Sequence, residues 1–250
     1  IRDFCLSRGL GDVYKRQCYN SEKTIERTLQ SVQSQTYQNY EYIIIDGGSV
    51  DGTLSIVEAY KSKFNGKMRV ISEKDDGIYD AMNKGIRMAQ GKLLGIVNSD
   101  DFYENTCLEN ALKKYNSNLP YQIIYGMMRI VNEKGEELAI SFNHHRNIRS
   151  TMINHPACFV TKALYEKYGC YNTKYRSAAD FDFMLKMFEQ KEVVFVPDHQ
   201  IYTNFTYGGM SGSYTGVQED NEVRYRNGII TRKKYILTKM KNSLKHYLGV

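Results

Sequence analysis

The stretch Lys92–Asp101 reads Lys-Leu-Leu-Gly-Ile-Val-Asn-Ser-Asp-Asp. Its apolar part, Leu93–Val97, ends abruptly in a polar cluster that holds two adjacent carboxylates. Apolar runs of this length, bounded by turn residues, are typical of strands that are buried on both faces of a parallel sheet. Ligands of open α/β sheets bind outside the carboxyl ends of such strands. The pattern therefore predicts that Asp100 and Asp101 stand at a ligand site.

Two earlier segments repeat this arrangement. Tyr42–Ile45 is apolar and leads into Asp46-Gly47-Gly48-Ser49, and Met68–Ile71 is followed by carboxylates at 73, 75 and 76. Parallel strands end at the same edge of a sheet, so these carboxylates should gather there. Hard cations such as Mg²⁺ take oxygen ligands. We therefore expect an acidic cleft able to hold a divalent cation.

Hydrophobic spacing predicts strands and helices that alternate along the first half of the chain. Ser21 is the expected N-cap of a first helix. The predicted strands are 42–46, 68–72 and 93–97, and the predicted helices that follow them are about 53–64, 78–89 and 105–116. This alternation calls for an α/β fold with a Rossmann-like, mostly parallel central sheet and right-handed crossovers.

The second half has a different pattern. The segments 122–131 and 136–142 predict a small β-hairpin, and further helices are expected over about 161–168 and 180–190. Short strands are expected near 192–196 and 200–206, before a glycine-rich loop at 208–213. No linker or repeat interrupts the sequence, so we expect one domain over 18–228.

Residues 1–17 do not fit this pattern. A first parallel strand should precede Cys18 and should be strongly apolar, but Lys15-Arg16-Gln17 stands where buried residues belong. Burying such charges without partners is costly. One interpretation is a strand that starts irregularly. We favour the other, in which 1–17 is an atypical leader foreign to the fold, such as a sequencing or assembly artefact.

Charge is concentrated at the end of the chain. Six of the 34 basic residues lie in 229–250, which contains no acid, and the other 28 balance the 28 acidic residues. This distribution argues against a nucleic-acid partner. Residues 229–250 also predict a basic amphipathic helix, which fits either peripheral contact with an anionic membrane or packing on the domain or in a homodimer. Scattered cysteines without a C-x-x-C pair favour a reducing compartment, so we expect the protein in the cytoplasm. If 229–250 contacts lipid, we expect it at the inner face of the cell membrane.

Four short motifs together resemble a known family. Tyr19–Glu22, Ile45–Thr53, Asp76–Gly85 and Asn98–Asp101 are similar, in this order, to the motifs of family 2 glycosyltransferases with the GT-A fold. The branch that makes bacterial surface polysaccharides is the most similar. The resemblance covers about residues 18–215, and it implies a nucleotide-sugar half at 18–117 and an acceptor half at 118–228.

The resemblance implies a set of residues that bind the nucleotide sugar or lie beside it. Some of them have simpler interpretations: Asp46 as a turn former, Glu22 as a helix cap, and Asp80 with Lys84 as a surface ion pair at i, i+4. The implied binding residues are Tyr19, Asn20, Glu22, Asp46, Gly47, Gly48, Asp76, Asp80, Lys84, Asn98, Ser99, His155, Gly208, Gly209 and Ser211.

A metal ion is implied by the same resemblance. Asn98-Ser99-Asp100 occupies the place of the family's D-x-D motif, with Asn98 where the first Asp is usual. Asp100 is therefore the expected ligand of Mn²⁺ or Mg²⁺, which offsets the charge of a nucleoside-diphosphate leaving group. Asp101 is either a second ligand or the N-cap of the next helix.

A catalytic base is implied in the second half. Ser177–Leu185 resembles the family segment that carries it, and the base position falls on Asp180, with Asp182 as the fallback. Ala179 stands where many members have Glu. Asp180 is alternatively an ordinary residue of a helix N-terminus. His155 lies in a segment similar to the one under the acceptor, and a structural role is its alternative.

These observations predict a metal-dependent, inverting transfer of sugar from a nucleoside-diphosphate sugar, by family habit UDP-linked, to a glycan or polyprenyl-linked acceptor. A sugar-nucleotide nucleotidyltransferase is one rival, although a Gly-rich phosphate loop with Arg or Lys is not visible. A non-catalytic nucleotide-sugar-binding subunit is the other, motivated by Asn98 and Ala179. A dehydrogenase is disfavoured because no G-x-G-x-x-G follows a strand.

Overall fold

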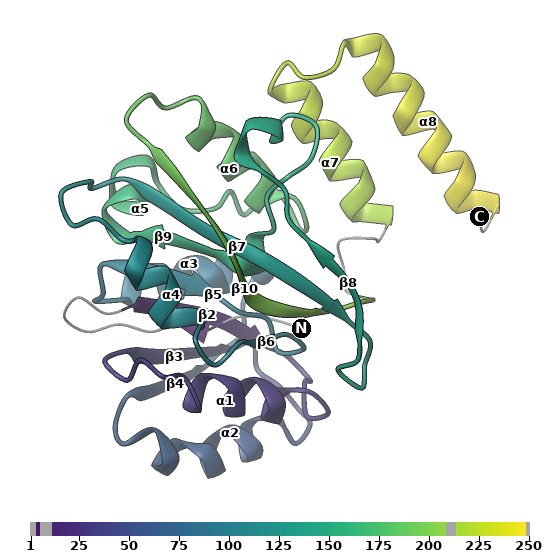
Figure 1. Cartoon of the computed structure of the whole chain (residues 1–250). Coiled ribbons are helices and arrows are strands. Elements are labelled where there is room, and N and C mark those ends of the chain that lie inside the picture. The colour runs from purple at the N-terminus through teal and green to yellow at the C-terminus, as the bar shows by residue number, and fades with distance from the viewer. Residues whose placement is uncertain (1–3, 6–11, 209–213, 249–250) are drawn as a thin grey trace.

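The computed structural model describes residues 4–5, 12–208 and 214–248, with side chains from Tyr19 onward except those of 245, 246 and 248. Figure 1 shows one central sheet with helices on both of its faces. The strands are β1 (Phe4–Cys5), β2 (Asp12–Cys18), β3 (Glu41–Asp46), β4 (Met68–Ser72), β5 (Leu93–Ile96), β6 (Phe102–Tyr103), β7 (Gln122–Val131), β8 (Glu137–Ser141), β9 (Cys158–Thr161) and β10 (Val194–Thr206). The helices are α1 (Ile25–Gln33), α2 (Thr53–Lys61), α3 (Ile78–Met88), α4 (Cys107–Lys114), α5 (Lys162–Tyr168), α6 (Ala179–Phe188), α7 (Tyr214–Arg226) and α8 (Arg232–Leu248).

The first half of the chain forms the parallel part of the sheet. β2 pairs in parallel with β3 and with β5, and β3 pairs in parallel with β4. The carboxyl ends of these strands therefore lie at one edge, as the sequence predicts. The predicted helices are present as α1, α2 and α3 between these strands and as α4 after β5 and β6. The loops that carry the acidic motifs all leave the sheet at this edge.

Alternating side chains of the strands supply two hydrophobic cores. In β3, Ile43 and Ile45 face the core under α3, α5 and α6, whereas Tyr42 and Ile44 face the core under α1, α2 and α4. β5 and β7 divide their side chains in the same way. Successive side chains of a strand point to opposite faces, so a strand that is apolar throughout must be covered on both. This explains the uninterrupted apolar runs of the sequence.

The second half extends the sheet with strands of mixed direction. β9 lies antiparallel between β5 and β7, and β10 pairs in parallel with β7 and antiparallel with β6. The predicted hairpin is confirmed as β7 and β8. Two separate short strands near 192–196 and 200–206 are wrong, because β10 is one strand whose register shifts between Pro197 and Thr203. Proline cannot donate to the ladder, and the bulge absorbs this interruption.

Residues 12–18 occupy the centre of the sheet. β2 lies between β3 and β5, which is the place that the fold requires of the first parallel strand. The backbone of this segment thus belongs to the fold in spite of its Lys-Arg-Gln sequence. That residues 1–17 have a foreign origin stays a prediction.

Two helix starts differ from the sequence-based expectation. The N-cap of α1 is Thr24 rather than Ser21, whose carbonyl accepts from the backbone N–H groups of Thr24 and Ile25. Helix α4 begins at Cys107 after the N-cap Thr106, so Asp101 is not the cap of this helix. The short strand β6 stands between Asp101 and α4, and it is this strand that delays the helix.

The end of the chain forms a helical pair, α7 and α8 (Figure 1). The predicted C-terminal helix is present as α8, but α7 was not predicted from the sequence. Its buried residues Gly216, Asn221 and Val223 include a single aliphatic side chain, and this gives no hydrophobic period. No helix in the described ranges has both the length and the apolar character needed to cross a membrane.

Candidate active site

A cavity of about 320 Å³ opens where the parallel edge meets the second half of the chain. It brings together Asn98 and Asp100, from the loop after β5, with His155 and with Asp180 of α6. Asp100 and Asp180 are 80 positions apart in the sequence and line the same space. The metal-ligand and base positions implied by the resemblance therefore face one cavity.

Asp180 lies in the first turn of α6, and its carboxylate is held from one side. Tyr79 Oη donates to Oδ1 at 2.8 Å, and the backbone N–H of Phe181 donates to the same oxygen at 2.9 Å. Oδ2 lies 4.0 Å from Nδ1 of His155, and the Asp180 side chain is 22% exposed. One carboxylate oxygen is thus fixed while the group as a whole remains accessible from the cavity. This is the geometry that a general base needs.

His155 is buried beside that carboxylate. Its Nε2 lies 2.8 Å from Tyr171 Oη, which in turn lies 2.8 Å from Tyr165 Oη. Burial lowers the pKa of His155, and nearby Asp180 opposes this only in part. The ring is therefore neutral at pH 7 and presents no cation to a phosphate. These contacts support the structural interpretation of His155, although the side chain lines the cavity.

The loop that carries Asp100 is anchored through its backbone. The Asp100 carbonyl accepts from Arg27 Nη2 at 3.0 Å and from Thr206 Oγ1. Arg27 comes from α1, where it also lies over the ring of Phe102, and Thr206 ends β10. Neither residue was predicted to serve the site. Nothing in the sequence marks them, because each acts on a main-chain atom of a distant residue.

Asp101 serves the loop internally. It is fully buried, Thr206 N donates to its Oδ1 at 2.9 Å, and Asn98 Nδ2 donates to its Oδ2 at 2.6 Å. Ser99 is also buried, and its hydroxyl lies 2.6 Å from that of Ser21. The structure thus places Asp101 and Ser99 beneath the cavity, where they shape the loop, and leaves Asp100 to face it.

The residues present fit a metal ion that is shared with a substrate. Among the residues whose side chains the structure describes, no group of three or more His, Cys, Asp or Glu could hold a metal ion. Mg²⁺ is commonly bound through one or two carboxylates plus phosphate oxygens and water, without an all-protein cage. Asp100 at the cavity wall supplies one such carboxylate.

Asp46 forms the turn that follows β3. It is fully buried, and its carboxylate accepts from the backbone of Gly48 and Ser49 and from the hydroxyls of Ser49 and Ser72. Gly48 has φ +83°, a conformation that favours glycine. The turn-forming interpretation of Asp46 is confirmed. Gly47 lies in the same turn, at the edge that also carries Asp100.

Residues 19–22 are bound to the loop after that turn. The Asn20 side chain accepts from Val50 N at 3.0 Å, and Glu22 Oε2 accepts from Gly52 N at 2.8 Å. Gly52 is the N-cap residue of α2, so Glu22 accepts from the start of α2 and does not cap α1. Tyr19 is 47% exposed beside these loops. The two motifs form one continuous surface at the carboxyl ends of β2 and β3.

A second cavity of about 290 Å³ lies beside the first and is lined by Asp76 and Asp80. Lys84 pairs with Glu73 at 2.8 Å and with Asp80 at 3.2 Å, so the predicted i, i+4 pair is confirmed. Lys84 is not among the described residues that line either cavity. Arg176, which sequence reasoning missed, lines both of them.

The predicted glycine-rich loop is described only at its start. Gly208 has φ +112° and follows the end of β10. Gly209 and Ser211 lie outside the described residues. Asp182 is not brought to the cavity, because it is buried on α6 and pairs with Lys186 at 2.6 Å.

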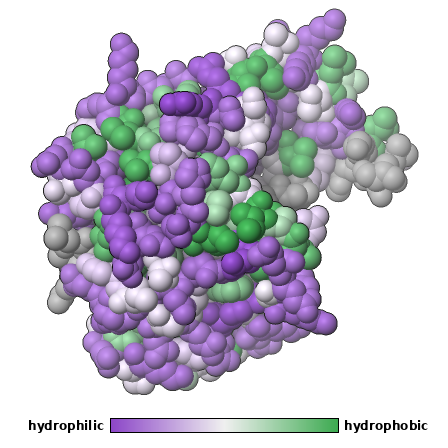
Figure 2. All heavy atoms as spheres, viewed as in Figure 1, coloured by the Kyte–Doolittle hydropathy of each residue, from purple (hydrophilic) through white to green (hydrophobic). Residues whose placement is uncertain are grey.

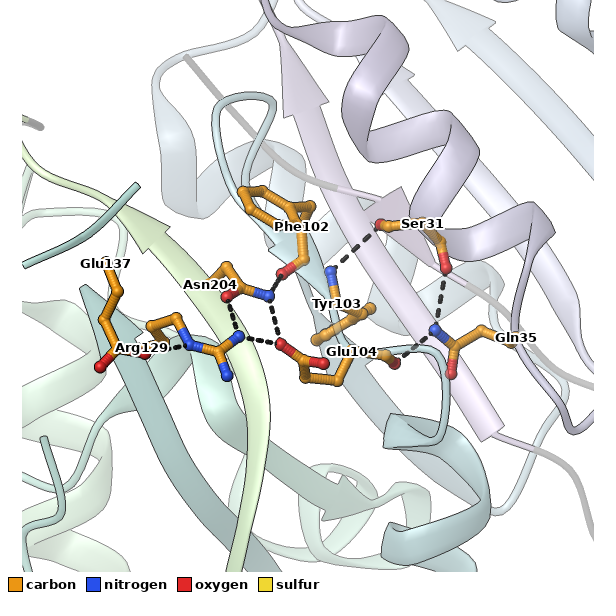
Figure 3. A network of polar contacts seen from close by, with 8 residues as sticks. All are labelled: Ser31, Gln35, Phe102, Tyr103, Glu104, Arg129, Glu137 and Asn204. Atoms are coloured by element: carbon orange, nitrogen blue, oxygen red, sulfur yellow. Dashed lines mark hydrogen bonds and ion pairs between the residues drawn. The ribbon is translucent and has the colours of Figure 1, made fainter. Parts of the chain in front are cut away.

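A polar network behind the Asp100 loop connects the two halves of the chain (Figure 3). Arg129 of β7 donates to Glu104, to Asn204 at 2.8 Å and to Glu137 at 2.7 Å. Gln35 of α1 donates to the Glu104 carbonyl at 2.8 Å. The network thereby fixes β6, which directly follows Asp101, between α1 and β10.

Comparison with known proteins gives a consistent result. Residues 17–196 match the family described as Glycosyl transferase family 2. A PGL/p-HBAD biosynthesis glycosyltransferase of Mycobacterium bovis is 29% identical over 198 residues, which is 78% of this chain and 76% of that protein. Chondroitin synthase of Escherichia coli is 28% identical over 233 residues, and these cover 90% of this chain but 34% of the synthase.

Solved structures share the fold at lower identity. S. aureus TarS 1–349, in complex with UDP-GlcNAc, superimposes with a TM-score of 0.66 and 20% identity over 92% of this chain and 71% of that one. The mannosyltransferase PcManGT from Pyrobaculum calidifontis, in complex with GDP-Man and Mn²⁺, gives a TM-score of 0.60 and 16% identity over 92% of this chain and 67% of that one.

The central sheet and its helices share the GT-A fold of these solved structures. The chain belongs to glycosyl transferase family 2, whose motifs account for most of its length. Of the rival interpretations, the nucleotidyltransferase is thereby set aside.

Proposed function

We propose that this glycosyltransferase moves a sugar, with inversion, from a UDP-linked donor to a glycan or lipid-linked acceptor in cell-surface polysaccharide synthesis. The observation that carries the proposal is that Asp100 and Asp180 line one cavity, with Asn98 beside them. The relatives support it by their names, which include a chondroitin synthase, and by a structural neighbour in complex with UDP-GlcNAc. The donor is cytoplasmic, and the reaction takes place at the inner face of the membrane where the acceptor is carried by a lipid.

Asp180 accepts the proton of the attacking acceptor hydroxyl. Inverting transfer is a single displacement, so one carboxylate opposite the leaving group is sufficient. Tyr79 fixes Oδ1, and Oδ2 is left as the oxygen that receives the proton. Neutral His155 stands 4.0 Å away and does not neutralise the base. Arg176 lines both cavities and supplies a cation for a charged group of either substrate.

Asp100 would hold Mn²⁺ or Mg²⁺, which supplies Lewis-acid stabilisation of the diphosphate leaving group when bound. Asn98 donates to Asp101 through its amide nitrogen and lines the cavity. In this proposal its amide oxygen accepts from a ribose hydroxyl. The surface formed by 19–22 and 46–52 binds the nucleotide base, with Tyr19 and the backbone at Gly47 and Gly48 as its contacts. Gly208, which follows β10, contacts the diphosphate.

The decisive experiment compares two conservative variants of α6 with a third at its C-cap residue, Glu189. Asp180→Asn keeps the shape of the base but cannot accept the proton, so kcat for sugar transfer should fall by about 100-fold or more. Asp182→Asn tests the fallback base, and Glu189→Gln is the control, since Glu189 is over half exposed in its pair with Arg149. Donor turnover is measured with a panel of nucleotide sugars in the presence of Mn²⁺. Transfer that survives in Asp180→Asn and disappears in Asp182→Asn would contradict the assignment.

The same experiment tests the non-catalytic alternative. A nucleotide-sugar-binding subunit should bind UDP with Mn²⁺ by isothermal titration and yet show no donor turnover in the unmodified chain. The carboxylates of Asp46 and Asp101 are hydrogen-bonded within their loops, whereas Asp100 and Asp180 line the cavity. The two carboxylates that transfer needs therefore remain at the cavity, and this favours an enzyme over a non-catalytic subunit.

A further inference from the structure

Helix α8 is held to the molecule along one side. Asn221 Nδ2 of α7 donates to the Tyr235 carbonyl at 3.0 Å, and the rings of Tyr225 and Tyr235 stack with centroids 4.7 Å apart. Gln218 Nε2 donates to the Lys239 carbonyl at 3.3 Å. In Figure 1, α8 lies at the outer end of the molecule, with α7 between it and the sheet. The docked side of α8 is therefore defined by polar and aromatic contacts with α7.

The opposite side of α8 carries exposed apolar side chains. Ile236, Leu237, Met240, Leu244 and Tyr247 are 44%, 56%, 65%, 58% and 87% exposed. Their spacing gathers them on one side of an α-helix, and we call this set the α8 stripe. Figure 2 shows green side chains next to purple ones over this end of the molecule. An apolar stripe of this size on a single helix marks an interaction surface.

Cations border the stripe. At 100° per residue, Lys234 and Lys241 lie along one border of the stripe, Arg232 and Lys239 lie along the other, and Lys233 lies within its first turn. All of these side chains are exposed. Residues 227–250 contain no acidic residue. The surface is thus both apolar and uniformly positive.

We propose that the α8 stripe lies on an anionic lipid surface. Lysine is depleted from the cores of protein–protein interfaces, where its charge would lose water. At a lipid interface the same side chains extend their ammonium groups to the head groups while the stripe enters the acyl boundary. Lys233 within the stripe therefore favours lipid over a protein partner or a second copy of the chain. This inference goes beyond the transfer reaction and does not depend on it.

Vesicle sedimentation of the purified chain tests the proposal. Vesicles of mixed phosphatidylglycerol and phosphatidylcholine should bind the protein, vesicles of phosphatidylcholine alone should bind it weakly, and raising the salt should release it. Leu237→Glu should lower the binding constant at least about tenfold, because it removes apolar area and adds a repelled charge. Lys233→Gln with Lys241→Gln should lower it about 25-fold, roughly fivefold for each lysine.

Strand β8 offers a matched control for the Leu237→Glu variant. Leu138 of β8 is 57% exposed, almost equal to Leu237, so Leu138→Glu makes the same chemical change outside the α8 stripe. This variant should bind anionic vesicles like the unmodified chain. Circular dichroism and thermal melts check that every variant is folded.

Three outcomes would overturn the proposal. They are failure of the unmodified chain to bind anionic vesicles, equal loss of binding in Leu237→Glu and Leu138→Glu, and a sedimentation-equilibrium dimer that Leu237→Glu dissociates without any vesicle binding. The last outcome would assign the stripe to a second copy. None of these measurements involves a sugar donor, so their failure is distinct from failure of the proposed reaction.

Discussion

Asp180 is positioned by one phenol, and the contribution of that contact can be measured. Tyr79 Oη donates to Oδ1 at 2.8 Å and is almost fully buried. In Tyr79→Phe the carboxylate loses a donor that favours its charged form, so kcat should fall about threefold to tenfold. Tyr40→Phe, which removes a buried phenol that donates to the Val32 carbonyl in the other core, is the control and should leave kcat unchanged.

His145 provides a test of stability against pH. Burial, with His144 and Arg146 nearby, lowers the pKa of His145 to about 4. Its Nδ1 lies 2.7 Å from Tyr125 Oη, which accepts from the His145 backbone N–H and therefore donates to the ring. Between about pH 6.5 and pH 4 the unfolded chain takes up a proton that the folded chain resists, so stability is lost as pH falls.

Urea unfolding at about pH 7.5 and pH 5 measures this effect. The free energy of unfolding should decrease at the lower pH, and His145→Gln should show a smaller decrease because the titrating ring is absent. Tyr125→Phe removes the phenol that occupies Nδ1 and should also weaken the dependence. Identical pH dependence in all three proteins would contradict the role assigned to His145.

At the scale of single elements, β7 and β10 approach each other closely at Gly126. A Cβ added at Gly126 of β7 would lie 2.5 Å from two ring atoms of Tyr202 and 2.7 Å from the Gln200 carbonyl. Gly126 thus lets the irregular part of β10 approach β7. Such a position tolerates no side chain unless the backbone moves.

Gly126→Ala should therefore destabilise the fold by about 1–3 kcal/mol through overpacking. For a protein of this size, that corresponds to a decrease in Tm of roughly 2–12 °C. Met127→Leu, a nearly volume-conserving change at the next position of β7, is the control and should leave Tm close to that of the unmodified chain. Equal Tm values for Gly126→Ala and Met127→Leu would contradict this prediction, because they would show that β10 can move away from the added methyl group without loss of stability.

The elements that could be predicted from the sequence are those with a clear hydrophobic pattern, either a continuous apolar run or helical spacing. β3, β5 and β7 carry uninterrupted apolar runs because both of their faces are covered, and the acidic ends of β3 and β5 follow from the same pattern. The bend of β10 could not be predicted, because Pro197 looks like the end of a strand rather than a bulge within it. Helix α7 could not be predicted either, since its burial depends on Asn221 and Gly216 as well as Val223.

At the scale of the whole molecule, ligand binding should be visible as stability. If Asp100 holds a cation shared with the donor diphosphate, UDP and Mn²⁺ together should raise Tm more than either alone. At a ligand concentration of about 100 times Kd the gain is about 2.7 kcal/mol, or roughly 5–10 °C.

Asp100→Ala should abolish sugar transfer and remove the Mn²⁺-dependent part of this shift, with Tm unchanged in the absence of ligand. Glu58→Ala, at an exposed carboxylate of α2, should keep both the shift and the activity. Full activity of Asp100→Ala, or undiminished turnover in EDTA, would remove the metal from the proposal.

The site itself was predictable only where a side chain faces the cavity. Asp100, Asp180 and His155 belong to motifs, and the structure places them together. Arg27 and Thr206 were missed, because they bind a main-chain carbonyl that any residue would offer. Such supporting contacts depend on tertiary structure and leave no local pattern in the sequence.

The two anchors of the Asp100 carbonyl are separated by 179 positions in the sequence. During synthesis on the ribosome, the acidic motif and Arg27 leave the exit tunnel long before Thr206 does. A nascent chain that ends before residue 206 therefore contains all of Asn98–Asp101 but only one of the two side chains that donate to the Asp100 carbonyl. Binding of the sugar donor should accordingly be among the last properties that the growing polypeptide acquires. Chains truncated before residue 206 should not bind the donor and so should not compete with the full chain for it.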